Sequence, residues 1–422
     1  MKQTDYDGCV RILKNELVPA FGCTEPIAIA YAAAKARQTL GQLPTGLTVR
    51  CSGNIIKNVK SVVVPATGDR KGIETAAVIG AVAGDADSGL EVLHAVTPAD
   101  QEQAAALLQT DYCQVELLDT KEKLHVIVEA AADGHKVLVE LKGTHTGIVR
   151  IEKDGALVFA AEAQTQAVEQ EDDSFLSFET IYEFAQTVDL ADVQEILGRQ
   201  IEYNSNIAEY GLAHPCGAGI GATLISAYGR DIKILAKALP AAGSDARMGG
   251  CEMPVVINSG SGNQGMTVSL PVIAYAKELG VGREKLYRAL CISNLTAIYQ
   301  KEQIGRLSAY CGAVSAGAGA GAGIAYLLGG GVAEISSVVS NTLANVAGII
   351  CDGAKASCAA KIASSVEAAL LAVSLTFHGH SFAAGDGIVQ QNPDETVEKV
   401  ATIAREGMKQ TDDVILKVMV GG

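Results

Sequence analysis

A stretch almost free of charge and crowded with glycine and alanine, from Tyr310 to Ala363, constrains the fold of this chain most. It reads YCGAVSAGAGAGAGIAYLLGGG at its start and GIICDGAKASCAAKIA towards its end. Side chains this small let backbones approach one another closely. The chain also carries 45 glycines and only 5 % aromatic residues, so we expect tight backbone packing to build much of its interior.

Three cysteines lie in this stretch, Cys311, Cys351 and Cys358. Thiols brought together without acidic neighbours favour a soft metal or an iron–sulfur cluster. The alternative is that they are small buried hydrophobic residues of the core. Seven residues of ideal helix would separate Cys351 from Cys358 by about 10.5 Å, so a shared site requires the backbone to turn near Gly353.

Residues 307–333 contain no charged side chain, which raises the possibility of a membrane span. Their high glycine content favours a buried element of a soluble protein instead, and so does the fact that a single isolated span fits no membrane architecture well. We therefore expect no membrane partner. A formal charge of −15 also argues against nucleic acid or an anionic membrane as a partner.

The first twenty residues lack the apolar core of a signal peptide, so we expect a cytoplasmic protein. Its ten cysteines are scattered without a CxxC pair, so a disulfide framework and a zinc ribbon are not expected. None of the lysines stands out as a Schiff-base site, and we expect no pyridoxal phosphate.

Two helices are predicted at the N-terminus, the first over residues 5–19. The second follows in FGCTEPIAIAYAAAKARQ, with Thr24 as a plausible N-cap. Cys23 then precedes a helix N-terminus, a position that lowers the pKa of a thiol. This makes Cys23 a candidate base, nucleophile or ligand, with an inert buried cysteine as the alternative.

Residues 46–161 are predicted to form an inserted α+β domain. Short β-branched runs at 47–53, 59–66, 113–119, 124–131, 135–143 and 146–153 are typical of strands, and residues 73–84 and 97–109 of helices. Within this domain, residues 52–71 gather amides and lysines that could receive a substrate carboxylate, among them Asn54 and Lys57. An ordinary solvated loop is the alternative.

A polar, acidic linker is expected over 162–174, followed by a largely helical domain over 175–422. The fold class is therefore α+β: a mainly helical, Gly/Ala-rich catalytic domain with a smaller α+β insertion, and residues 1–45 packing on the catalytic domain.

Polar, glycine-rich turns are predicted at 214–221 and 242–267. In the second, SGSGNQG comes directly before a predicted helix, so its N–H groups could bind an anion. It lacks the lysine of a phosphate-binding loop, which favours a carboxylate over a nucleotide.

Five groups of residues, in this order, resemble the L-cysteine desulfidase family, a relative of the iron–sulfur L-serine dehydratases. They are GCTEP (22–26), CSGNIIKN (51–58), SDARMGG with SGSGNQG (244–265), CGAVSAGAGAGAG (311–323) and CDGAKASC (351–358). The resemblance spans almost the whole chain.

The resemblance implies an oxygen-sensitive [4Fe-4S] cluster that eliminates the β-substituent of a small L-amino acid. It implies Cys311, Cys351 and Cys358 as cluster ligands, and Cys23 as the proton-abstracting base or, alternatively, a further ligand. The substrate's carboxylate and amino groups are then expected at Thr24, Asn54, Lys57, Ser259, Ser261, Gly262 and Asn263.

GCTEP stands where the serine dehydratases carry a Ser-Ser-His-Thr segment, which favours L-cysteine as the substrate. Two alternatives remain: a serine or threonine dehydratase that uses the same site, and a small-ligand-binding or membrane protein without chemistry. Ala-rich helices also make a homodimer an expectation.

Overall fold

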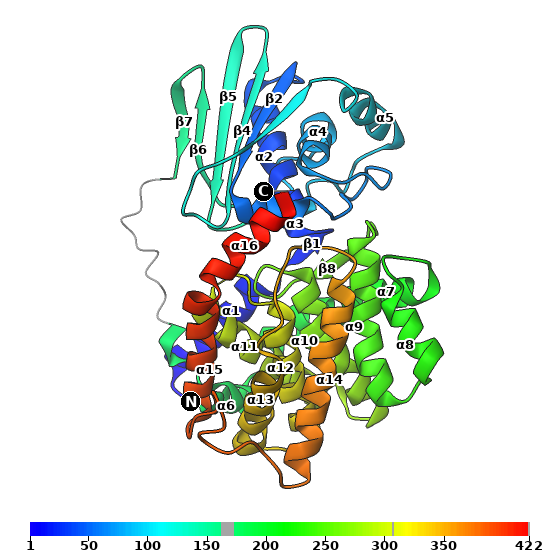
Figure 1. The fold of residues 1–422 in the computed structure, drawn as a ribbon, viewed down its shortest axis with the longest axis vertical. Helices are drawn as coiled ribbons and strands as arrows, with labels where there is room; N and C mark the ends of the chain where they lie inside the picture. The colour runs from blue at the N-terminus through cyan, green and yellow to red at the C-terminus, as the bar shows by residue number, and fades with distance from the viewer. Residues whose placement is uncertain (162–172, 306–307, 421–422) are drawn as a thin grey trace.

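Two parts make up the fold of the computed structural model, which describes residues 1–161, 173–305 and 308–420 (Figure 1). A sheet with helices on it forms the upper part, and a bundle of helices forms the lower part. The predicted α+β class, with a mainly helical larger part, is confirmed. Most of the predicted linker falls on residues 162–172, outside the described residues.

The upper part contains a six-stranded sheet in the order β3-β2-β4-β5-β6-β7. β2 pairs with β3 in parallel, and the remaining pairs are antiparallel. Five of the six expected strands are present; the exception is 59–66, where α3 ends and turns follow. The strands are β2 (Gly46–Cys51), β3 (Cys113–Leu117), β4 (His125–Ala132), β5 (His135–Lys142), β6 (Ile148–Lys153) and β7 (Ala156–Ala160).

Helix α2 (Thr24–Leu40) packs on this sheet beside α4 (Ile73–Ala83), rather than on the helical part as expected. Its alanines let α4 come close: a Cβ on Gly80 would lie 2.3 Å from the Ala30 carbonyl oxygen. Only α1 (Gln3–Glu16) packs on the lower helices. Residues 1–45 are thus divided between the two parts. The upper part also holds α3 (Gly53–Val59) and α5 (Pro98–Leu107).

Helix α12 (Gly312–Leu327) is the centre of the lower part and is buried along nearly its whole length among its neighbours. A Cβ on Gly319 would lie 2.6 Å from the Ser293 carbonyl oxygen of α11, and one on Gly317 would lie 2.9 Å from that of Ser365 in α14. Small residues therefore permit the close packing that the sequence predicted. The helices around α12 are α10 (Gly262–Glu278), α11 (Arg283–Ile304), α13 (Val332–Val346) and α14 (Cys358–Phe377).

Further helices cover this centre, and α9 is longer than expected, because residues 242–248 continue it instead of forming a turn. These helices are α6 (Phe178–Thr187), α7 (Leu190–Ala213), α8 (Ile220–Tyr228), α9 (Ile232–Met248) and α15 (Pro393–Thr402). A short antiparallel pair of β1 (Pro19–Phe21) and β8 (Pro254–Val256) ties the start of the chain to the segment before α10.

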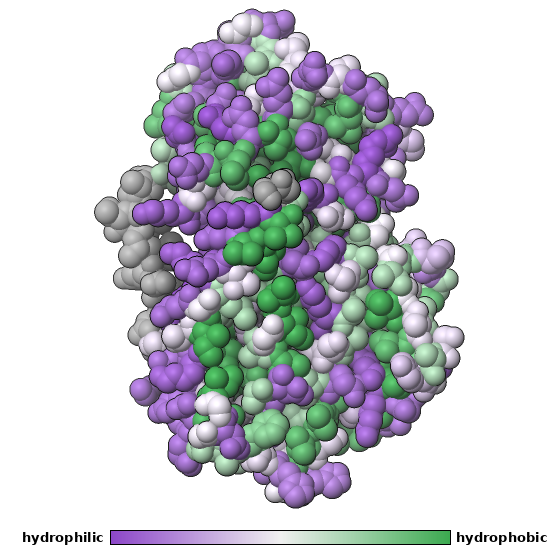
Figure 2. Space-filling view, in the orientation of Figure 1, coloured by the Kyte–Doolittle hydropathy of each residue, from purple (hydrophilic) through white to green (hydrophobic). Residues whose placement is uncertain are grey.

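The last helix, α16 (Lys409–Val420), runs from the lower part to α3 in the upper part (Figure 1). Lys57 of α3 forms an ion pair with Asp412 of α16. Leu416 occupies the space in which a Cβ of Gly53 would lie. Figure 2 shows apolar groups gathered along the path of α16, and Val414 and Val418 are among the exposed apolar residues of the chain.

Within the described residues, α14 is the one helix long and apolar enough to cross a membrane, and 56 % of that stretch is buried inside the protein. This burial is typical of a core helix.

Candidate functional site

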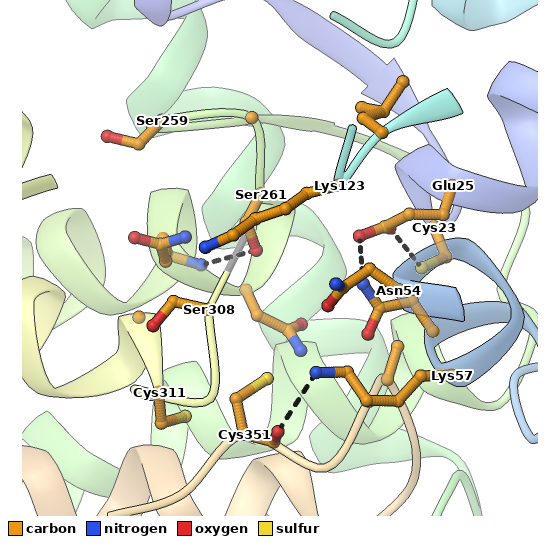
Figure 3. Close-up of a pocket in the computed structure, with 18 of the residues that line it drawn as sticks. Cys23, Glu25, Asn54, Lys57, Lys123, Ser259, Ser261, Ser308, Cys311 and Cys351 are labelled. Carbon is orange, nitrogen blue, oxygen red and sulfur yellow. Dashed lines mark hydrogen bonds between the residues drawn. The ribbon is translucent and has the colours of Figure 1, made fainter. Parts of the chain in front are cut away.

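A cavity of about 400 Å³ lies between the two parts of the chain (Figure 3). This volume is within the range of small-molecule sites. Residues of all five groups quoted above line it. In Figure 3, Cys311 and Cys351 lie at the lower left of the cavity, whereas Cys23 and Glu25 lie at its right. The cavity therefore has a cysteine wall from the lower helices and a second wall from α2 and α3.

Main-chain hydrogen bonds hold Cys311 and Cys351 side by side. Tyr310 and Ile350 form an isolated antiparallel bridge, and the Cys311 N–H donates to the Ile349 carbonyl (3.0 Å). The two thiols share a hydrogen bond, which raises the pKa of Cys311 and lowers that of Cys351. Two cysteines far apart in the sequence thus form one pair.

Cys358 is the first residue of α14 and lines the same cavity. The chain between it and Cys351 is not helical, and Gly353 adopts a left-handed conformation with φ +92°. A Cβ at Gly353 would lie 2.3 Å from the Lys57 carbonyl oxygen, so the turn admits only glycine there. The turn that the sequence required near Gly353 is therefore present.

The three thiols of the cysteine wall, those of Cys311, Cys351 and Cys358, are better suited to bind an iron–sulfur cluster than a single metal ion. In the described residues, no three His, Cys, Asp or Glu side chains converge closely enough to hold one metal ion. A cubane needs no such convergence, because each thiolate binds a different iron. Three soft donors facing one cavity from three backbone positions match that requirement.

Cys23 precedes α2, as predicted, but the expected lowering of its pKa is wrong. Cys23 itself is the N-cap residue, while Thr24, the predicted cap, opens the helix. Burial raises the pKa of the Cys23 thiol well above its usual value, and the neighbouring Glu25 carboxylate raises it further. Cys23 is only 1 % exposed. The loss of water therefore has a larger effect on the pKa of Cys23 than the helix N-terminus has, and Cys23 is a protonated thiol in this setting.

Glu25 is a cavity residue that the sequence analysis did not single out. Its carboxylate accepts hydrogen bonds from the Cys23 thiol (3.3 Å), the Thr24 hydroxyl (3.0 Å) and the Asn58 amide (3.0 Å). The sequence did contain a signal for Glu25: an acidic residue within GCTEP is followed by apolar residues, and a carboxylate in such surroundings needs hydrogen-bond partners.

The turn before α10 faces the cavity with the predicted Ser259, Ser261, Gly262 and Asn263 nearby. Ser261 is the N-cap of α10, and its hydroxyl accepts from the Gln264 N–H (3.5 Å). Ser259 and Asn263 line the cavity, and Gly262 begins the helix. The Thr24 hydroxyl also lies 3.1 Å from the Gly260 carbonyl oxygen, and its single proton is shared between this oxygen and the Glu25 carboxylate, so Thr24 joins α2 to this turn.

Arg247, at the end of α9, is a second cavity residue that the sequence analysis did not single out. It is 3 % exposed, and its guanidinium donates to the Gly22 carbonyl (3.1 Å) and to the Asn263 side chain (3.3 Å). Arg247 therefore joins the turn at Gly22, before α2, to the turn before α10, and it places a positive charge beside both turns.

Asn54 and Lys57 come from α3, a short helix rather than a loop. Asn54 lines the cavity, and its side-chain oxygen is buried with no hydrogen-bond partner among the described residues. Lys57 is 2 % exposed; its ammonium pairs with Asp412 and contacts the Cys351 carbonyl oxygen (3.5 Å). Lys57 is therefore already paired, and Asn54 has free hydrogen-bonding capacity toward a ligand.

In the described part of the chain, α2 begins at the cavity wall after Cys23, α10 after Ser261, α12 after Cys311, and α14 at Cys358. Helix N-termini carry partial positive charge and unpaired N–H groups. The cavity is thus suited to an anion although the whole chain is acidic.

A model of the serine dehydratase alpha chain family matches residues 87–417. The chain belongs to this family. It is therefore a serine-dehydratase-like enzyme of the lyase type. The region matched contains Arg247, the turn before α10 and the three cysteines of the cavity wall.

The chain is also similar along its whole length to curated proteins named UPF0597 protein. The one from Lachnoclostridium phytofermentans is 59 % identical over 98 % of this chain and 99 % of its own length. Those from Finegoldia magna and Treponema denticola are 46 % and 45 % identical, over 97 % and 99 % of this chain and 98 % and 99 % of their own lengths. These alignments include residues 22–58, which precede the serine dehydratase alpha chain match.

Proposed function

We propose that the chain catalyses β-elimination of L-cysteine, with water consumed and pyruvate, ammonia and hydrogen sulfide formed. One observation carries the proposal: three cysteines from the lower part of the chain face, across a small cavity, the turn before α10 and the Cys23–Glu25 pair. Membership of the serine dehydratase alpha chain family supports the reaction class. L-Serine or L-threonine dehydration on the same site is the alternative.

A [4Fe-4S] cluster bound by Cys311, Cys351 and Cys358 would leave one iron without a protein ligand, able to act as a Lewis acid toward the leaving group. The residues of the chain supply the remaining functions: binding the carboxylate and amino groups, and taking the proton from Cα.

The substrate carboxylate is assigned to the N-terminus of α10. Ser261, Gly262 and Asn263 present the first turn of that helix at the cavity, and Arg247 lies against Asn263. A carboxylate at a helix N-terminus gains both hydrogen bonds and the helix dipole. Ser259 and Thr24 hold the neighbouring turn in place.

The substrate amino group is assigned to the unpaired Asn54 oxygen, which can accept a hydrogen bond from an ammonium or amine. Lys57 lies behind this position, paired with Asp412, and contributes positive charge between Asn54 and Cys351. With both ends of the substrate held, its Cα lies between the cysteine wall and the Cys23–Glu25 pair.

The test is anaerobic purification or reconstitution with iron and sulfide, followed by measurement of pyruvate and sulfide from L-cysteine. Pyruvate from L-serine and 2-oxobutyrate from L-threonine are measured in parallel. A higher kcat/KM for L-cysteine is expected. Preference for L-serine or L-threonine would reassign the substrate, and reconstituted protein inactive on all three would overturn the lyase proposal.

A further inference from the structure

The GCTEP turn presents two groups that could accept a proton, and they differ in access to the cavity. Both residues line the cavity, but Cys23 is only 1 % exposed and its thiol donates a hydrogen bond to Glu25, whereas Glu25 is only partly buried. Figure 3 shows the thiol of Cys23 directed at the Glu25 carboxylate. The group with the better access to a bound substrate is therefore Glu25.

The hydrogen bonds around Glu25 all run towards its carboxylate. Cys23 and Thr24 donate to one oxygen, and Asn58 donates to the other. Three donors, Cys23 and Thr24 at the start of α2 and Asn58 in α3, fix the orientation of the carboxylate. A carboxylate is normally deprotonated at neutral pH, and a thiol is not.

We propose that Glu25 is the catalytic base that removes the Cα proton, with Cys23, Thr24 and Asn58 as positioning residues; this inference rests on the proposed function. The Cα–H bond breaks and its proton goes to the Glu25 carboxylate. The electron pair of that bond forms the Cα–Cβ double bond, and the Cβ–S bond breaks with its pair leaving on sulfide. The aminoacrylate that results takes up water and yields pyruvate and ammonia.

The experiment compares Glu25→Gln and Glu25→Asp with Cys23→Ser in reconstituted enzyme. Glu91→Gln, at an exposed acid that does not line the cavity, is the matched control. Loss of a general base lowers kcat by about 10² to 10⁴-fold, so this loss is expected for Glu25→Gln with little change in KM. Glu25→Asp keeps the charge on a shorter side chain and should lose less. Cys23→Ser keeps a donor to Glu25 and should lose less than Glu25→Gln.

Two readouts other than activity keep the result interpretable. Iron content and thermal unfolding should match those of the wild type in all variants, which shows that fold and cluster are intact. L-Alanine, which has no leaving group, should raise the unfolding temperature of wild type and of Glu25→Gln equally, because binding does not depend on the base. Should Glu25→Gln fail to fold, Glu25→Asp carries the comparison.

Three outcomes overturn the assignment: kcat of Glu25→Gln within about threefold of wild type, a larger loss for Cys23→Ser than for Glu25→Gln, or loss of the L-alanine shift, which would make Glu25 a binding group. Each requires active wild-type enzyme. Inactive wild-type enzyme instead removes the proposed function itself.

Discussion

Lys57 of α3 and Asp412 of α16 form a buried ion pair that joins the upper part of the chain to the last helix. The side chain of Lys57 is 2 % exposed and that of Asp412 is 14 % exposed. The pair lies directly behind the cavity, since the same ammonium contacts the Cys351 carbonyl oxygen. It therefore links the stability of α16 to the geometry of the cysteine wall.

Asp412→Asn should destabilise the protein strongly, because it leaves the Lys57 ammonium buried without a counter-ion. The expected loss is about 3–5 kcal/mol in the free energy of unfolding, measured by urea denaturation. Asp413→Asn is the control, since Asp413 is the next residue on the same helix and is exposed. Equal stability of the two variants would show that the ion pair contributes little.

Replacing any one of Cys311, Cys351 and Cys358 by serine should lower the iron content of the reconstituted protein and abolish pyruvate formation. Each supplies one soft ligand, and a hydroxyl is a poor substitute for a thiolate. Cys216→Ser is the control, because Cys216 is a partly exposed cysteine outside the cavity lining. Full iron content in one of the three variants would remove that residue from the ligand set.

Gly319→Ala should destabilise the lower part of the fold, because its Cβ would lie 2.6 Å from the Ser293 carbonyl oxygen. Overpacking of this kind costs about 1–3 kcal/mol, which thermal or urea unfolding can measure. At Gly348 a Cβ meets nothing within 4 Å, so Gly348→Ala provides the matched control. A neutral effect at Gly319 would mean that α11 and α12 can separate without cost.

Stability should depend on pH through Glu140. Burial opposes ionisation of Glu140, but hydrogen bonds from Lys142 and His125 lower its pKa below the usual value, with Arg150 adding to the effect. Because the folded-state pKa is depressed, this contribution is present above the unfolded-state pKa of about 4.3 and is lost as the pH falls through the folded-state value.

Glu140→Gln should therefore lose about 1.5–3 kcal/mol at pH 7, and the difference from wild type should shrink below about pH 4. Urea unfolding at several pH values measures it. Glu116→Gln, on an exposed site of the same sheet, should follow the wild type throughout. A difference for Glu140→Gln that is constant with pH would contradict the assignment.

The elements that sequence patterns predict well are those with local signals. β4 and β5 follow from β-branched runs separated by a glycine turn, and the helix predicted over 97–109 is present as α5, where Thr97 and Asp100 form a capping box. The expected strand at 59–66 is wrong for a related reason. Val62 is buried against the distant residues Cys23 and Met248, and Val59 and Val64 are buried in the core under the sheet, rather than by pairing in it.

Most residues of the candidate site could be predicted from the sequence, but the charge state of Cys23 could not. The motifs identified the cysteine wall and the turn before α10, and the turn at Gly353 followed from helix geometry. The charge state of Cys23 did not follow, because the burial of this thiol depends on residues far away in the chain. The packing of α2 on the sheet was missed for the same reason: an alanine-rich helix fits many surfaces equally well.

The bridge between Tyr310 and Ile350 has a consequence for how freely sequences of this family can vary. It is made by main-chain groups, so the spacing of the backbone at Cys311 and Cys351 does not depend on hydrogen bonds from the neighbouring side chains. Apart from the close-packed Gly312 and Gly353, residues around the two cysteines can therefore vary without breaking the main-chain contacts that hold this part of the cavity wall.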